Sequence, residues 1–151
     1  MSEKETHERA LTEAIAQKEE ANNLSIELDN AGSKIDQLIG NRRSIREESS
    51  SSQVTCGDIV EFIKKINEAV KLKVFGTAIG YAKEIATSAT TCSEEEKKYL
   101  TSRMALMKEA KYETEKIILS YHLALIETEQ KINQIERNIR NMGYDSANTI
   151  Q

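Results

Sequence analysis

The sequence of 151 residues contains no proline and no tryptophan, and only two phenylalanines and five tyrosines. Proline breaks helices because it lacks an amide hydrogen and clashes with the preceding turn, so its absence permits helices of unusual length. With so few aromatic side chains, a core must be built from Leu, Ile, Val, Met and Ala. Charged residues make up 30% of the chain, with both signs interleaved. That pattern is typical of long solvated helices.

Other absences exclude several classes of function. The formal net charge is −4, and no segment is strongly basic, which argues against nucleic-acid binding. The charged N-terminus lacks the apolar segment of a signal peptide. No apolar run approaches the roughly 20 residues that cross a bilayer. We therefore expect a cytoplasmic protein without a membrane partner, and export by a signal-less route stays open.

The residues that carry catalysis are scarce. The only histidines are His7 and His122, and His122 has no Asp, Glu or Cys three or four residues away on its helix. The sequence holds no HExxH motif, no paired CxxC and no glycine-rich phosphate loop. We predict that the protein is not an enzyme and that it holds no cofactor and no metal.

Residues 3–47 are predicted to form a first helix, followed by a serine-rich linker over residues 48–57. An apolar stripe with steps of three and four residues runs along the second half of this helix, and Arg42 is its one charged member. Towards the N-terminus the stripe is weak, so we expect the first half to pack poorly. The stripe consists of Leu24, Leu28, Ala31, Ile35, Leu38, Arg42 and Ile45.

Residues 58–90 are predicted to form a second helix that begins at Asp58. The question is whether this helix is straight or breaks near Gly76. In a straight helix, Cys56 and Cys92 lie about 50 Å apart and cannot bond. In a broken helix, the two halves fold into a hairpin and the two cysteines come within range of a disulfide. We favour the straight helix, with both cysteines as free thiols.

The third predicted helix, residues 93–142, carries the most specific pattern in the chain. Ser93 caps its start, Gly143 ends it, and residues 144–151 are expected to be disordered. Its stripe alternates steps of four and three over about six heptads, which predicts left-handed supercoiling against a partner helix. The stripe is Leu100, Met104, Met107, Lys111, Thr114, Ile118, Tyr121, Leu125, Thr128, Ile132, Ile135, Ile139 and Met142.

Together these patterns predict an all-α fold in one domain, with three long helices in an elongated, antiparallel, coiled-coil-like bundle that runs up, down and up. The third helix should extend past the second by about 17 residues, leaving residues 126–142 uncovered. Arg42 and Lys111 either set the register of the helices or lay their stems along the core with the charge in water. The predicted partner-binding residues are Leu125, Thr128, Ile132, Ile135, Ile139 and Met142.

The function predicted from these features is that of a non-enzymatic coiled-coil interaction protein: a scaffold, an adaptor or an assembly component. It binds another helical protein or itself, and we expect a homo-oligomer. One alternative is a small chaperone or secreted partner, because the hairpin outline resembles small helical proteins that travel with bacterial secretion systems, although their Trp-x-Gly turn is missing. A second alternative is a membrane-active helical protein, which rests on residues 59–86.

Overall fold

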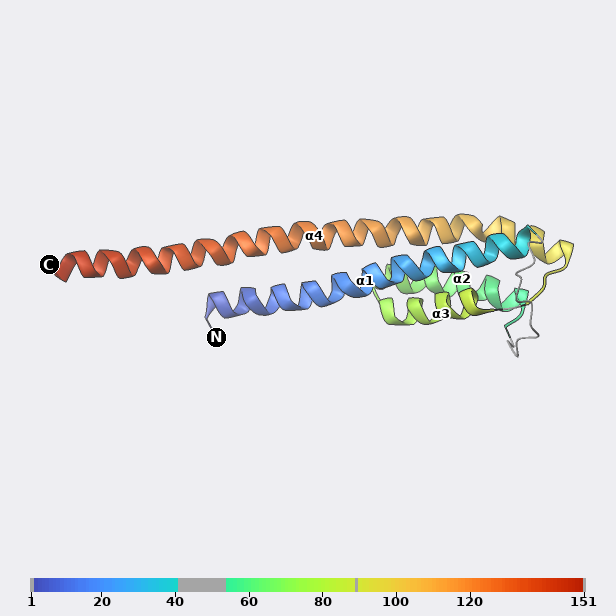
Figure 1. Cartoon of the computed structure of the whole chain (residues 1–151), viewed down its shortest axis with the longest axis horizontal. Helices are drawn as coiled ribbons and strands as arrows, with labels where there is room; N and C mark the ends of the chain where they lie inside the picture. Colours follow the sequence, from blue (N-terminus) through green and yellow to red (C-terminus); the bar gives the residue numbers. More distant parts are fainter. Residues whose placement is uncertain (1, 41–53, 89, 151) are drawn as a thin grey trace. The chain divides into compact units, whose positions relative to one another are not determined.

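The structure is a computed structural model that describes residues 2–40, 54–88 and 90–150 of the chain. The described residues form helices and no strands, so the all-α prediction is confirmed. The number of predicted helices is wrong, because the second one is divided in two. The four helices are α1 (Glu3–Ile39), α2 (Cys56–Lys71), α3 (Phe75–Thr87) and α4 (Glu94–Ile150), as Figure 1 shows.

The division lies at residues 72–74, before the glycine where the sequence placed an alternative break. Lys73 adopts a left-handed conformation with φ of 59°. The amide of Val74 donates to the carbonyl of Ala69 at 2.9 Å, and the amide of Lys73 donates to Val70 at 3.0 Å. This pair of bonds is the Schellman motif, which satisfies the last carbonyls of a helix. The chain then reverses, so that α2 and α3 form a hairpin; the straight second helix is a wrong prediction.

Helices α2 and α4 each have a capping box at their start, whereas α3 has no side-chain cap. Thr55 and Asp58 exchange two hydrogen bonds of 3.0 Å, so α2 begins at Cys56 and Asp58 lies in its first turn. Ser93 and Glu96 exchange bonds of 2.9 and 3.2 Å ahead of α4, as the sequence predicts.

The far ends of the predicted helices differ from the structure. The last helix does not stop at Gly143 but continues to Ile150. A glycine inside a helix costs only about 1 kcal/mol, and no proline follows it to force an end. Residues 41–47 of the first predicted helix, including Arg42, and most of the serine-rich linker lie outside the described residues.

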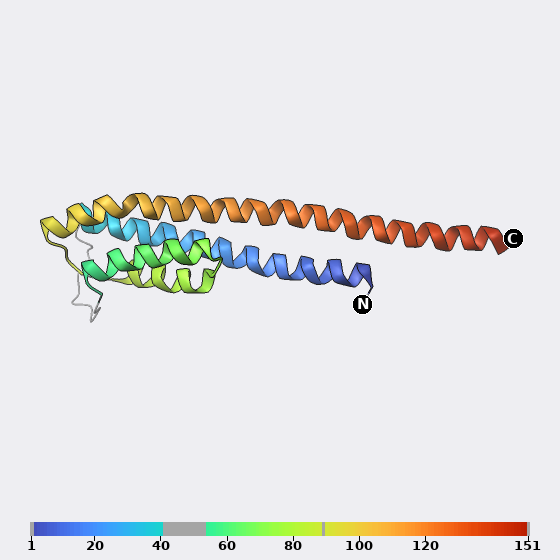
Figure 2. The same ribbon diagram turned by 180° about the vertical axis from the view of Figure 1, so that it is seen from behind.

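The chain divides into two compact units, each built partly from α1 and partly from α4. Unit 1 consists of Met1–Glu19 and Ile118–Gln151, and unit 2 consists of Glu20–Ile117. Unit 2 therefore contains the second part of α1, all of α2 and α3, and the first part of α4. Figures 1 and 2 show the α2–α3 hairpin lying alongside these parts of α1 and α4 in both views.

Unit 2 has a continuous apolar core. The predicted stripe on the second half of α1 is its buried face there. The rings of Phe62 and Tyr81 pack at 5.1 Å between α2 and α3, and the amide of Asn67 on α2 donates to the carbonyl of Leu106 on α4. Side chains that are completely enclosed come from all four helices: Leu24 and Ile35 from α1, Ile59, Ile63 and Ile66 from α2, Ile85 from α3, and Leu100 and Thr114 from α4.

Unit 1 contains only two helices, and they run antiparallel. The ammonium of Lys4 pairs with the carboxylate of Glu136 at 3.2 Å, and that of Lys18 contacts Nδ1 of His122 at 3.2 Å. From Lys4 to Lys18 the chain advances fourteen residues along α1, while their partners on α4 go back fourteen residues, from Glu136 to His122. The two helices therefore run in opposite directions. The predicted up, down, up order placed these two segments parallel. It is wrong because the hairpin adds one more reversal.

Candidate functional site

The face of α4 in unit 1 that carries the predicted binding residues is only partly covered. Its members down to Ile135 are half-buried, whereas Ile139 and Met142 are 56% and 68% exposed. None of the described side chains of unit 1, residues 2–19 and 118–142, is buried. The half-buried members of this face are Ile118, Tyr121, Leu125, Thr128, Ile132 and Ile135.

The opposing face of α1 explains the incomplete burial. Its half-buried side chains also recur every three and four residues, but most of them are polar. They are Lys4, His7, Leu11, Ala14 and Lys18. The isoleucines of α4 therefore face amines, an imidazole and a small methyl group, and Leu11 is the one large apolar side chain on this ridge of α1.

The antiparallel register also corrects the predicted overhang. The sequence left residues 126–142 without a partner helix. In unit 1, Glu136 is level with Lys4, so the first turn of α1 reaches that point. Beyond it, Ile139 and Met142 extend past the beginning of α1 at Glu3. The overhang of α4 is thus shorter than predicted.

A second apolar row lies on the outer face of α4 in unit 1, and sequence reasoning missed it. Leu119, Leu123 and Ile126 are 57%, 58% and 42% exposed. They follow one another at steps of four and three residues, so they share one side of the helix. A signal was present, because residues 117–126 contain no charged side chain. Three adjacent exposed aliphatic side chains make a small patch rather than scattered surface residues.

Lys111 ties α1 to α4 within unit 2. Its ammonium lies 2.8 Å from the carboxylate of Asp29 and 2.8 Å from the hydroxyl of Ser25, and it also donates to the Ser25 carbonyl at 3.1 Å. These three contacts join Lys111 to one turn of α1. Its side chain is 25% exposed, so its stem is largely covered as well.

Cys56 and Cys92 form a disulfide across the start of α2 and the residue before the cap of α4. Their Cα atoms are 5.9 Å apart and they are 36 residues apart in the chain. The loop that the bond closes contains the whole α2–α3 hairpin. Cys56 is only 2% exposed, so its sulfur lies within the core of unit 2. The sequence favoured a straight second helix with free thiols. The structure instead has the alternative geometry, a hairpin with a disulfide.

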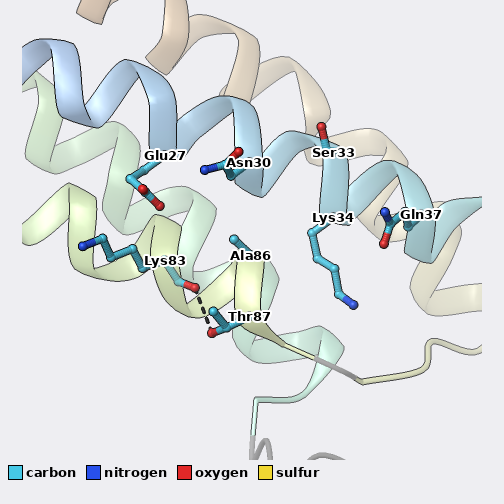
Figure 3. Close-up of a pocket in the computed structure, with 8 residues that line it drawn as sticks. All are labelled: Glu27, Asn30, Ser33, Lys34, Gln37, Lys83, Ala86 and Thr87. Carbon is cyan, nitrogen blue, oxygen red and sulfur yellow. Dashed lines mark hydrogen bonds between the residues drawn. The ribbon is translucent and has the colours of Figure 1, made fainter. Parts of the chain in front are cut away.

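One groove of unit 2 is lined mainly by residues with polar side chains. It lies between α1 and α3 (Figure 3) and holds about 520 Å³. Glu27 and Lys34 reach from α1 toward α3, and the hydroxyl of Thr87 donates to the Lys83 carbonyl at 2.9 Å. No nucleophile is held by a base in this groove. Among the described residues, no three His, Cys, Asp or Glu side chains gather as a metal site would require.

Two exposed groups have shifted pKa values, one in each unit. In unit 1 the hydrogen bond and charge of Glu136 raise the pKa of Lys4 above its ordinary value. In unit 2 the backbone amide of Ser93, helped by its hydroxyl, lowers the pKa of Glu96. Both shifts report contacts that hold helix ends, and neither describes an acid or base poised for catalysis.

Comparisons with known proteins returned no family model, no curated relative and no solved structure that matches this chain. Within the described helices, none is both long enough and apolar enough to cross a membrane.

Proposed function

We propose that this chain is a non-enzymatic helical interaction protein, a scaffold, adaptor or assembly component, that binds a partner helix along α4 in unit 1. The observation that carries the proposal is the incomplete burial of that face. The heptad pattern of α4 continues in apolar residues to Met142, yet no described side chain of unit 1 is buried.

The energetic reason is the apolar area left in water. Complete burial of a Leu or Ile side chain contributes roughly 1.5–3 kcal/mol. In unit 2, four helices enclose such side chains completely, as with Leu24 and Ile63. In unit 1, Leu125, Ile132 and Ile135 stay half-buried. A further helix of apolar character would gain the burial that α1 does not provide.

The experiment compares the wild type with a variant in which Ile132, Ile135 and Ile139 are all replaced by serine. Molar mass is measured by light scattering on a sizing column at several concentrations, and bound proteins are recovered from an extract of the source cells. We expect the wild type to form a defined oligomer or to retain a defined protein, and the serine variant to lose it. Equal masses and equal bound proteins for the two chains would refute the proposal.

The disulfide bears on where the protein works. Persistent disulfides are rare in the reducing cytosol and common in oxidising compartments. The Cys56–Cys92 bond therefore favours an oxidising compartment over the cytoplasm expected from the sequence. Alkylation of thiols in freshly lysed source cells, followed by mass spectrometry, tests this. If both cysteines are alkylated before any reductant is added, they are free thiols in the cell, and that result would favour the cytoplasm.

A further inference from the structure

We propose that the partner of α4 is a second copy of the same chain, and that the two α4 helices pair in parallel over residues 118–142 after displacing the first half of α1. This inference rests on the proposed function, because it names the partner and the cover of the same face.

The present cover is weak. Residues 2–19 of α1 offer α4 a ridge whose polar members are Lys4, His7 and Lys18. Two of the contacts between these helices are a Lys4–Glu136 ion pair and a Lys18–His122 hydrogen bond. Exposed contacts of this kind contribute little to stability, because water and salt screen them. A more apolar helix can therefore replace this part of α1 at small cost.

A second α4 is such a helix. In a parallel pair, positions a and d of the heptad meet their own copies across the interface. Position a of residues 118–142 is occupied by Ile118, Leu125, Ile132 and Ile139, and position d by Tyr121, Thr128, Ile135 and Met142. β-Branched residues at a, as at three of these four positions, occur in two-stranded parallel coiled coils. The pairing covers about three and a half heptads and includes Ile139 and Met142, which α1 leaves exposed.

The flanking charges select the parallel direction. In a parallel coiled coil, position g of one helix faces position e of the next heptad on the other. Lys131 occupies g and Glu136 occupies e, so the pair forms two symmetric Lys131–Glu136 bridges. In the antiparallel register that aligns the stripe with itself, Lys131 would face Lys131 and Glu129 would face Glu129. Like charges that face each other along the flanks of the interface oppose that arrangement.

The exchange gives Glu136 a new ion-pair partner. Glu136 now pairs with Lys4 of α1, and Lys131 pairs with Glu127 of its own helix at 3.6 Å. On dimer formation Glu136 exchanges Lys4 for Lys131 of the other copy. The first half of α1 therefore acts as a displaceable cover, which keeps the apolar face of α4 partly shielded while the chain is monomeric.

The first test introduces a cysteine at a d position. Ile135→Cys should form an intermolecular disulfide on mild oxidation, located at residue 135 by peptide mass, because parallel pairing places the two copies of residue 135 together. Gln130→Cys, at an outward position of the same helix, is the matched control and should not cross-link. A cross-link at 130 but not at 135, or none at either, would overturn the parallel dimer.

The second test separates the charges from the cover by sedimentation equilibrium. Lys131→Glu should raise the dissociation constant of the dimer about tenfold, because two attractive contacts become repulsive. Lys131→Gln should raise it less. A double variant, His7→Leu with Lys18→Leu, gives α1 a better apolar ridge and should also weaken the dimer. Its control, Arg9→Leu with Ala16→Leu, adds apolar side chains on the outward face of α1 and should not.

The outcomes distinguish this inference from the proposed function. A wild type that stays monomeric at all concentrations, yet binds another protein that the triple serine variant loses, overturns the dimer and leaves the proposed function standing. A dimer that is insensitive to Lys131→Glu and to the α1 variants overturns the parallel register and the displaceable cover. Loss of dimer in the α1 double variant but not in its control supports the exchange.

Discussion

Units 1 and 2 are built from the same two long helices, but only unit 2 has a core. In unit 2 the side chains of α1 at Ala21, Leu24 and Ile35 are completely enclosed. In unit 1 the side chains of α1 that face α4 are only half-buried, and so are the apolar side chains of α4 that face α1. The periodicity is similar in both units. What differs is the number of neighbouring helices, because the α2–α3 hairpin belongs to unit 2.

A regular heptad stripe therefore predicts which side of a helix faces a neighbour, but not how completely that side is buried. Two helices shield a stripe from one direction, whereas four enclose it. The residues on α1 agree with this difference. Its inward positions are leucine, isoleucine and alanine where the hairpin is present, whereas in unit 1 they are two lysines, a histidine, an alanine and a single leucine.

The largest difference in stability between the two units should come from the disulfide. Replacing Cys56 and Cys92 by alanine removes a link between residues 36 apart in the sequence. A crosslink of this span lowers the entropy of the unfolded chain enough to stabilise the fold by about 4 kcal/mol. We expect the free energy of unfolding of unit 2 to fall by that order, measured by urea unfolding, and hydrogen exchange of amides in α2 and α3 to accelerate.

The control is the wild type in the presence of reductant, which should show the same decrease. Amides of residues 5–19 in unit 1 should exchange at unchanged rates, since the loop closed by the bond lies in unit 2. Equal acceleration of amide exchange in both units would mean that they unfold together, which would contradict the difference in stability between them.

The next effect compares two isoleucines on equivalent stripes. Ile63 in unit 2 is completely buried, whereas Ile132 in unit 1 is half-buried. Truncation of a buried isoleucine to alanine costs about 2–5 kcal/mol, because it removes apolar contacts and leaves a cavity. We expect Ile63→Ala to lie in this range and Ile132→Ala to cost about 1 kcal/mol or less, by urea unfolding of dilute protein. Equal costs would show that unit 1 packs as tightly as unit 2.

Much of the fold follows from patterns that were visible in the sequence. The stripe from Leu24 to Ile35, the cap at Ser93 and the face of α4 were all identified correctly, because periodicity and capping are local properties. The sequence favoured an unbroken second helix, with a break near Gly76 as the alternative. In the structure the helix ends at Lys71, and the reversal depends on a left-handed lysine rather than on a glycine. Local propensity does not indicate that residue, and the reversal is stabilised by packing of the two short apolar faces against α1 and α4.

The candidate site was predicted less well, and for a related reason. The sequence placed the binding face on residues 125–142, but the missed hairpin reversed the direction of the last helix relative to the first. Only the register shows that α1 reaches Glu136. The partner of Lys111 could not be named either, because Asp29 lies on a distant segment and meets it only through the antiparallel pairing of α1 and α4. Contacts between distant segments depend on the topology of the helices. One missed reversal, as between α2 and α3, changes which segments lie side by side.

The smallest expected difference between the two units is their opposite response to pH. Glu96 in unit 2 has a pKa lowered from 4.5 by the Ser93 amide. Its contribution is therefore complete above that value and is lost as the pH falls through the lowered pKa of the folded state. Lys4 in unit 1 has a pKa raised from 10.5 by Glu136. Its contribution is complete below that value and is lost as the pH rises through the raised pKa.

Acid should therefore loosen the first turn of α4 in unit 2, and alkali should loosen the beginning of α1 in unit 1. Both groups lie at the surface, so the changes are local and small. NMR chemical shifts of the amides near Ser93 and near Lys4, followed across the two pH ranges, measure them. Glu96→Gln should abolish the acid transition alone, and Lys4→Met the alkaline one alone. A single variant that removes both transitions would show that the two helix ends are coupled, and unit 1 would then share the cooperativity of unit 2.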